Sequence, residues 1–114
     1  MKIFLADDAT LVREGLAGIL ERVGHTVVGQ TSDAPSTLAA VRELLAGDPG
    51  AVDVLVTDVR MPPTMSDDGL RVAVELRSDF PDLSVMVLSQ YVAPAYASAL
   101  FDPVAMARPG ADRR

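Results

Sequence analysis

The segment Val54-Leu55-Val56-Thr57-Asp58 decides the fold, because it is a short apolar run that ends on an acid. A run of this kind, without alternating polar residues, is typical of a strand that is buried on both faces of a parallel sheet. Two further runs have the same form, Ile3–Ala6 and Val85–Leu88. Val27 and Val28 mark the centre of another short strand, so the sequence predicts four strands.

Helical patterns separate the strands. The first helix is predicted from six apolar residues spaced three or four apart and expected to be buried: Leu11, Val12, Leu16, Ile19, Leu20 and Val23. Gly24 supplies a left-handed stop, and Ser32 or Asp33 caps a second helix that has Pro35 in its first turn. A third helix begins near Leu70 and is broken at 80–82, and a fourth runs from 94 to 100. This alternation predicts a doubly wound α/β fold, with a parallel sheet and helices on both faces.

Composition fits one domain of ordinary size. The chain has 114 residues, of which 49% are hydrophobic and 23% charged, and its formal net charge is −6. The acidic excess argues against nucleic-acid binding by this chain, which normally needs a surplus of Lys and Arg. No apolar stretch approaches the roughly 20 residues that span a bilayer, and no export signal is present, so we expect a cytoplasmic protein without membrane contact. Cysteine is absent, which excludes disulfides.

Acids and a hydroxyl follow three of the strands. Asp7 and Asp8 follow the first strand, Asp58 ends the third, and Ser89 ends the fourth. Because the carboxyl ends of parallel strands meet at one edge of the sheet, these side chains should converge. Crowded carboxylates call for a cation, and hard oxygen ligands favour Mg²⁺. The alternative is that the acids are ordinary turn and cap residues, with Asp8 capping the first helix.

The sequence resembles the receiver domain of two-component response regulators. The resemblance runs from Met1 to about Leu100 and rests on four segments: Asp7-Asp8, 54–63, Asp68-Gly69-Leu70 and 87–91. The loop after Asp58 and the segment from Ser89 are most similar to regulators with a LuxR-type helix-turn-helix output domain. The implied fold is flavodoxin-like.

The resemblance also implies a function for the site residues. Asp58 would accept a phosphoryl group from a sensor histidine kinase, in a Mg²⁺-dependent phosphorelay that regulates transcription in full-length relatives. Asp7, Asp8, Asp58 and the backbone carbonyl of Arg60 would hold the metal, and Ser89 would bond the phosphoryl group. Such a protein is a signalling component and not an enzyme.

The C-terminal end departs from the family pattern. A receiver's fifth strand ends in lysine, whereas the only lysine here is Lys2, and Arg108 is the nearest stand-in. An arginine keeps the charge but presents a planar fork. We therefore divide the chain into a receiver-like domain of four βα units, 1–100, and a divergent tail, 101–114, in which the fifth βα unit is missing or degenerate. The exposed sheet edge would favour a homodimer or a strand-exchanged oligomer.

Two other functions stay open. Without the usual lysine, the domain could be a degenerate, unphosphorylated receiver that serves as an interaction or dimerisation module. A magnesium-dependent phosphohydrolase with Asp58 as nucleophile would need an acid/base aspartate two residues on, where the sequence has Arg60.

Overall fold

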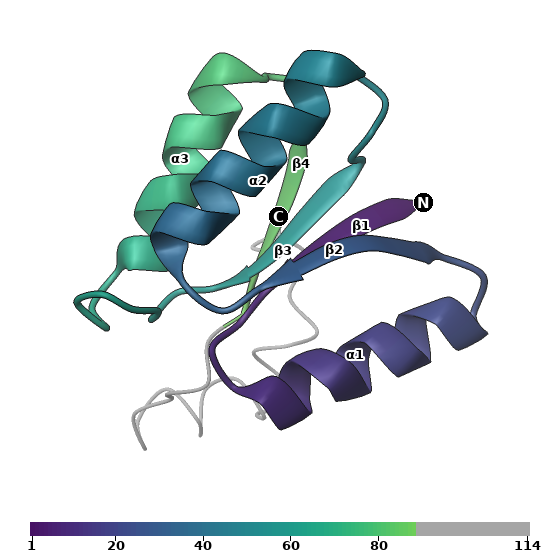
Figure 1. Cartoon of the computed structure of the whole chain (residues 1–114), viewed down its shortest axis with the longest axis horizontal. Helices are drawn as coiled ribbons and strands as arrows, with labels where there is room; N and C mark the ends of the chain where they lie inside the picture. The colour runs from purple at the N-terminus through teal and green to yellow at the C-terminus, as the bar shows by residue number, and fades with distance from the viewer. Residues whose placement is uncertain (89–114) are drawn as a thin grey trace, which may run out of the picture.

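A parallel four-stranded sheet forms the centre of the molecule (Figure 1). The computed structural model describes residues 1–88. The strands are β1 (Lys2–Ala6), β2 (Thr26–Thr31), β3 (Val54–Asp58) and β4 (Ser84–Leu88), in the order β2-β1-β3-β4. All described pairings are parallel. The expected α/β class is therefore confirmed, and β1 and β3 are neighbours at the centre.

Helices cover both faces of the sheet. Helix α1 (Thr10–Arg22) lies on one face, and α2 (Ala34–Gly47) and α3 (Asp68–Asp79) lie side by side on the other (Figure 1). Each face has its own apolar cluster. The cluster under α2 and α3 includes Phe4, Leu55 and Leu76, and the cluster under α1 includes Leu5 and Val56. Alternate residues of β1 and β3 thus point into different clusters, which explains why both strands are apolar without interruption.

The buried face of α1 differs from the expected stripe. Its contacts with the sheet come from one buried residue and two half-buried ones, Ala17, Leu16 and Leu20. Four of the six predicted residues are exposed, so their predicted burial was wrong: Leu11 (86%), Val12 (42%), Ile19 (54%) and Val23 (66%). At 100° per residue, Val12, Ile19 and Val23 fall on a flank of the helix and Leu11 on its far side. Periodicity located an apolar helix but not the part of it that meets the sheet.

The ends of the helices follow the local sequence. The Asp33 side chain accepts a hydrogen bond of 2.7 Å from the Ser36 backbone N–H, so this acid caps α2 as expected. Pro35 occupies the first turn, where its missing N–H costs nothing. Gly24 has a φ of 99°, the left-handed conformation that ends α1.

Several expectations lie outside the described residues. These are the fourth helix, Ser89, the 101–114 tail with Arg108, and the state of the fifth βα unit. Within residues 1–88 no helix is long and apolar enough to cross a membrane.

Candidate functional site

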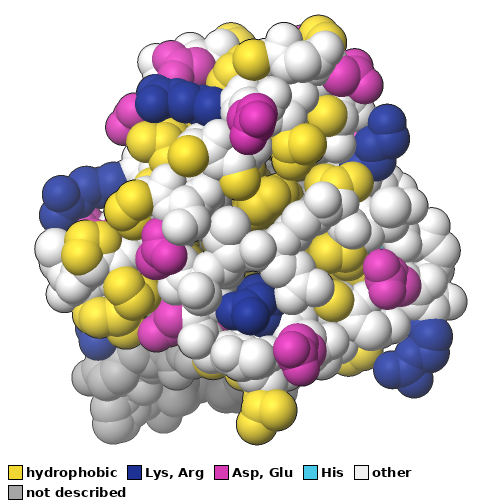
Figure 2. All heavy atoms as spheres, in the orientation of Figure 1, with side chains coloured by type: hydrophobic (Ala, Val, Ile, Leu, Met, Phe, Trp, Pro, Cys, Tyr) yellow, Lys and Arg dark blue, Asp and Glu magenta, His cyan; other side chains and the backbone are white. Residues whose placement is uncertain are grey.

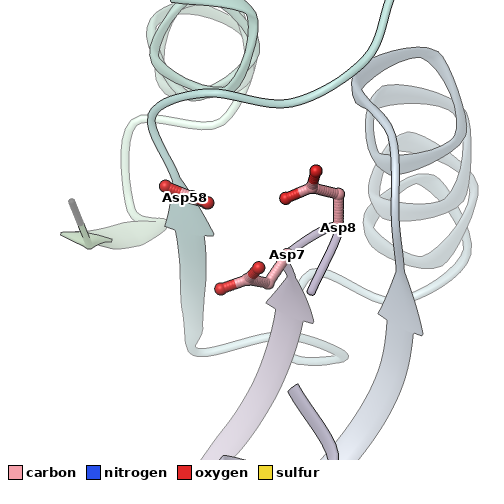
Figure 3. Close-up of side chains that lie close together, drawn as sticks. All are labelled: Asp7, Asp8 and Asp58. Carbon is pink, nitrogen blue, oxygen red and sulfur yellow. The ribbon is translucent and has the colours of Figure 1, made fainter. Parts of the chain in front are cut away.

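Three carboxylates converge at the carboxyl edge of the sheet. Ala6 is paired with Thr57, so Asp7, which follows β1, lies beside Asp58, the last residue of β3. Carboxylate oxygens of Asp7, Asp8 and Asp58 all lie within 4.8 Å of one another. Figure 3 shows the three side chains facing a common space above the two strands. The predicted convergence of the acids is confirmed.

The loop between β1 and α1 has a specific structure. Asp7 is buried; its backbone N–H donates to the Thr31 carbonyl at 3.1 Å, and its side chain accepts from the Ala9 N–H at 2.8 Å. Helix α1 begins at Thr10, with Ala9 as a cap residue that makes no side-chain capping bond. Asp8 therefore does not cap α1, which removes one part of the view that these acids are ordinary cap residues.

Asp58 carries its charge in an unfavourable place. Its side chain is buried, and burial raises the pKa of this carboxyl, an effect reinforced by the charges of Asp7 and Asp8. Backbone hydrogen bonds from Arg60 and Val59 act on the pKa in the opposite direction, but they do not offset the rise. A cation among the three acids would remove this repulsion.

The donor set suits a hard cation. All three side chains offer oxygen, and each contributes a ligand atom to one cluster, so these residues could hold a metal ion. Two of the three acids are buried, where a charge without a partner costs most. The oxygen donors suit a hard cation, and such a cation would offset the repulsion that raises the pKa of Asp58.

Gly69 is a site residue whose role was not predicted, although it was noted as part of the motif that opens the third helix. Its N–H donates to the Val59 carbonyl at 3.0 Å. A Cβ at Gly69 would collide with the carbonyl oxygen of Asp58 and lie 3.0 Å from the Thr57 hydroxyl oxygen. The missing side chain thus lets α3 pack directly on the backbone of the central acid. An Asp-Gly pair at a helix start was the only signal for this in the sequence.

The loop before α3 is tied to the helix by Asp68. This buried carboxylate accepts hydrogen bonds from the hydroxyl of Thr64 and, at 3.3 Å, from its backbone N–H. The bond from the Thr64 hydroxyl is the main cause that lowers the pKa of Asp68. Asp68 therefore holds the loop in its charged form.

The comparison with known families gives one clear result. The family model of the response regulator receiver domain matches residues 3–107. The chain belongs to this family.

Curated relatives of this chain carry the names of regulatory proteins. The receiver is 33% identical over 103 residues to the transcriptional regulatory protein RcsB of Salmonella typhi, covering 90% of this chain and 45% of that protein. It is 33% identical over 91 residues to the oxygen regulatory protein NreC of Staphylococcus carnosus, covering 80% of this chain and 39% of that protein. The receiver thus spans less than half the length of these curated relatives.

Solved structures agree with the fold. The isolated receiver domain of RcsB from Salmonella enterica serovar Typhimurium, in the presence of the phosphomimetic BeF3−, matches with a TM-score of 0.68 and 32% identity, covering 90% of this chain and 70% of that one. The receiver domain of the putative response regulator NarL from Mycobacterium tuberculosis matches with a TM-score of 0.67 and 31% identity, covering 83% and 70%. The flavodoxin-like receiver fold is therefore confirmed.

Of the other residues considered for the site, one lies beside the acids, one lies far from them and two are outside the described residues. Arg60 follows the cluster, and its backbone N–H hydrogen-bonds to Asp58, but the expected role of its carbonyl stays a prediction. Ser89 and Arg108 lie outside the described residues. Lys2 lies at the opposite edge, at the start of β1, where its ammonium donates to the Gly50 carbonyl at 3.1 Å. Lys2 therefore does not reach the acids.

Proposed function

We propose that this receiver accepts a phosphoryl group on Asp58 from a sensor histidine kinase, in a Mg²⁺-dependent step. The observation that carries the proposal is the meeting of three carboxylate oxygens within 4.8 Å at the end of β3. Family membership supports the proposal. So does the similar RcsB receiver structure, which was determined in the presence of BeF3−, a mimic of a phosphoryl group.

The chain's own residues can be given distinct roles in this step. A carboxylate oxygen of Asp58 attacks the phosphorus of a phosphohistidine. The new P–O bond forms as the P–N bond breaks, and the departing imidazole takes a proton from solvent. Asp7, Asp8, Asp58 and the Arg60 carbonyl would hold Mg²⁺, which when bound supplies positive charge against the acids and the phosphoryl oxygens.

Other groups would act on the phosphorylated form. The Ser89 hydroxyl would donate to a phosphoryl oxygen, and Arg108 would stand in for the lysine of other receivers. Each transfer changes Asp58 itself, so the protein is a signalling component and not an enzyme that turns over. In a longer protein like the transcriptional regulatory protein RcsB, the output would be altered gene expression.

Intact-protein mass spectrometry tests the proposal. With Mg²⁺ and a small phosphodonor, the wild-type chain should gain the mass of one phosphoryl group, and the gain should vanish in Asp58→Asn. Asp82→Asn is the matched control, because it removes one exposed acid near the opposite edge of the sheet. A gain that persists in Asp58→Asn would overturn the assignment.

One observation favours a second function. The sole lysine lies at the edge opposite Asp58, so the described residues contain no lysine that could neutralise a phosphoryl group. This supports a receiver that acts without phosphorylation, as an interaction module, a homodimer or a strand-exchanged oligomer. Partner affinity should then be the same with and without the active kinase, and a kinase-driven change would exclude this function.

A further inference from the structure

Arg13 connects the acid loop to two other elements. It lies in the first turn of α1, and its Nη1 donates to the main-chain carbonyl of Asp7 at 2.7 Å. Its Nε donates to the side-chain oxygen of Gln30, in β2, at 3.1 Å. The planar guanidinium fixes the directions of both bonds, so Arg13 bridges the loop and the neighbouring strand.

The carbonyl that Arg13 binds lies between the two acids of the loop, so it affects the positions of their carboxylates. It belongs to the peptide group that joins Asp7 to Asp8. A peptide group is planar, so holding this carbonyl fixes the two consecutive Cα atoms relative to it and restricts where the two carboxylates can lie. The Ala9 N–H holds the Asp7 side chain at 2.8 Å. Without Arg13, the peptide could rotate and separate the Asp8 oxygens from those of Asp7 and Asp58.

We propose that Arg13 is a positioning residue, which strengthens cation binding by holding the Asp7–Asp8 peptide in the orientation that joins their oxygens to Asp58. This inference rests on the proposed function, because it concerns the cation that Asp58 and its neighbours would bind. It assigns Arg13 no contact with the cation or the phosphoryl group.

Removing Arg13 would have two opposite effects on Mg²⁺ affinity, one from its charge and one from its hydrogen bonds to the loop. A guanidinium near three acids repels an incoming cation, so on charge alone its removal would tighten Mg²⁺ binding. On position, removal would weaken binding because the oxygens no longer converge. The charge effect is small, since Arg13 is only half-buried and salt screens its charge. Outer partners that orient metal ligands are typically worth 10- to 100-fold in metal affinity.

Calorimetric titration with Mg²⁺ alone separates these effects. Arg13→Met should raise the Mg²⁺ dissociation constant by about tenfold. Gln30→Leu, an exposed change that alters no charge, should raise it by a smaller factor in the same direction. Because both residues belong to one bridge, the double variant should be weakened by less than the product of the single effects.

Arg22→Met is the matched control, since it removes the same side chain from the last turn of the same helix. Its Mg²⁺ affinity should equal that of the wild type. In the metal-free proteins, the Asp8 amide resonance should move in Arg13→Met and Gln30→Leu but not in Arg22→Met. Thermal unfolding identifies any variant that fails to fold, and Gln30→Leu then carries the test.

The outcomes distinguish the inference from the proposed function. Unchanged or tighter Mg²⁺ binding in Arg13→Met, or equal weakening in Arg22→Met, would overturn the role of Arg13 while leaving the cation site intact. A wild-type chain that binds no Mg²⁺ and accepts no phosphoryl group would instead overturn the proposed function, and the role of Arg13 with it.

Discussion

Asp58, the central acid of the site, should lower the stability of the metal-free protein. Burial and two neighbouring carboxylates oppose its charge. Asp58→Asn keeps an oxygen that can accept the backbone N–H groups but removes the charge. We expect this change to raise the free energy of unfolding of the metal-free protein by about 1 kcal/mol, as measured by urea denaturation. Added Mg²⁺ should stabilise the wild type more than the variant. A destabilised metal-free variant would contradict this account.

Asp68 gives a pH dependence of known sign. Its pKa is lowered below the ordinary value of 3.8. A carboxylate with a lowered folded-state pKa stabilises the protein fully above its ordinary value and loses this effect as the pH falls through the folded value. The wild type should therefore be more stable than Asp68→Asn at pH 7, and the difference should shrink below about pH 4. Denaturation at a series of pH values measures it, and a difference that grew in acid would refute it.

Single residues were predictable where the sequence itself marks them. Asp7, Asp8 and Asp58 stand at the carboxyl ends of apolar strands, so their convergence followed from the parallel arrangement of those strands. Gly69 and Arg13 act on groups contributed by other segments. The role of Gly69 depends on how closely α3 approaches β3, and that of Arg13 on the direction in which the first turn of α1 faces. Local sequence predicts neither the distance nor the direction.

At the level of elements, α2 depends on its cap. Asp33→Ala removes the carboxylate that accepts the Ser36 N–H and hydroxyl hydrogen bonds. It should lower the free energy of unfolding by about 1 kcal/mol. Glu43→Ala, an exposed change in the interior of the same helix, should have little effect. Chemical denaturation compares the two, and equal losses would show that the cap is not the cause.

The contact between α3 and β3 should be the least tolerant of added volume. Gly69→Ala places a methyl group against the Asp58 carbonyl, which belongs to the backbone and cannot move aside as a side chain would. We expect a loss of about 1–3 kcal/mol in unfolding free energy. Because the strain falls on Asp58, Mg²⁺ affinity should also fall. Gly18→Ala meets open space in the interior of α1 and is the control, expected to be neutral or stabilising.

The positions of the helices and strands were predicted well from the sequence, whereas the buried side of α1 was not. All four described strands and three helices lie where the apolar runs, glycine stop and Asp33 cap indicated. The buried side of α1 did not, because its apolar residues spread over more of the circumference than the sheet contacts. Which part of such a helix is covered depends on small residues such as Ala17 that allow close approach, and hydrophobicity alone does not single them out.

For the whole molecule, the parallel sheet with helices on both faces was predictable, because alternating βα units leave few arrangements. The division of the chain at residue 100 stays a prediction. Charged side chains of both signs are scattered over the face seen in Figure 2, among exposed apolar ones, and the basic groups on that face lie singly. The acids that form a cluster lie instead at one edge of the sheet.

The acids can meet only after β3 pairs with β1 during folding. The first paired residues of the two strands, Ile3 and Val54, are 51 positions apart, so this contact closes a long loop and is entropically expensive. During synthesis β1, α1 and β2 emerge before β3. The acid cluster cannot form until β3 docks and brings Asp58 next to the charges of Asp7 and Asp8. Relieving that repulsion should speed docking, so Asp58→Asn should refold faster than the wild type in stopped-flow experiments without metal. Equal rates would place the pairing after the rate-limiting barrier.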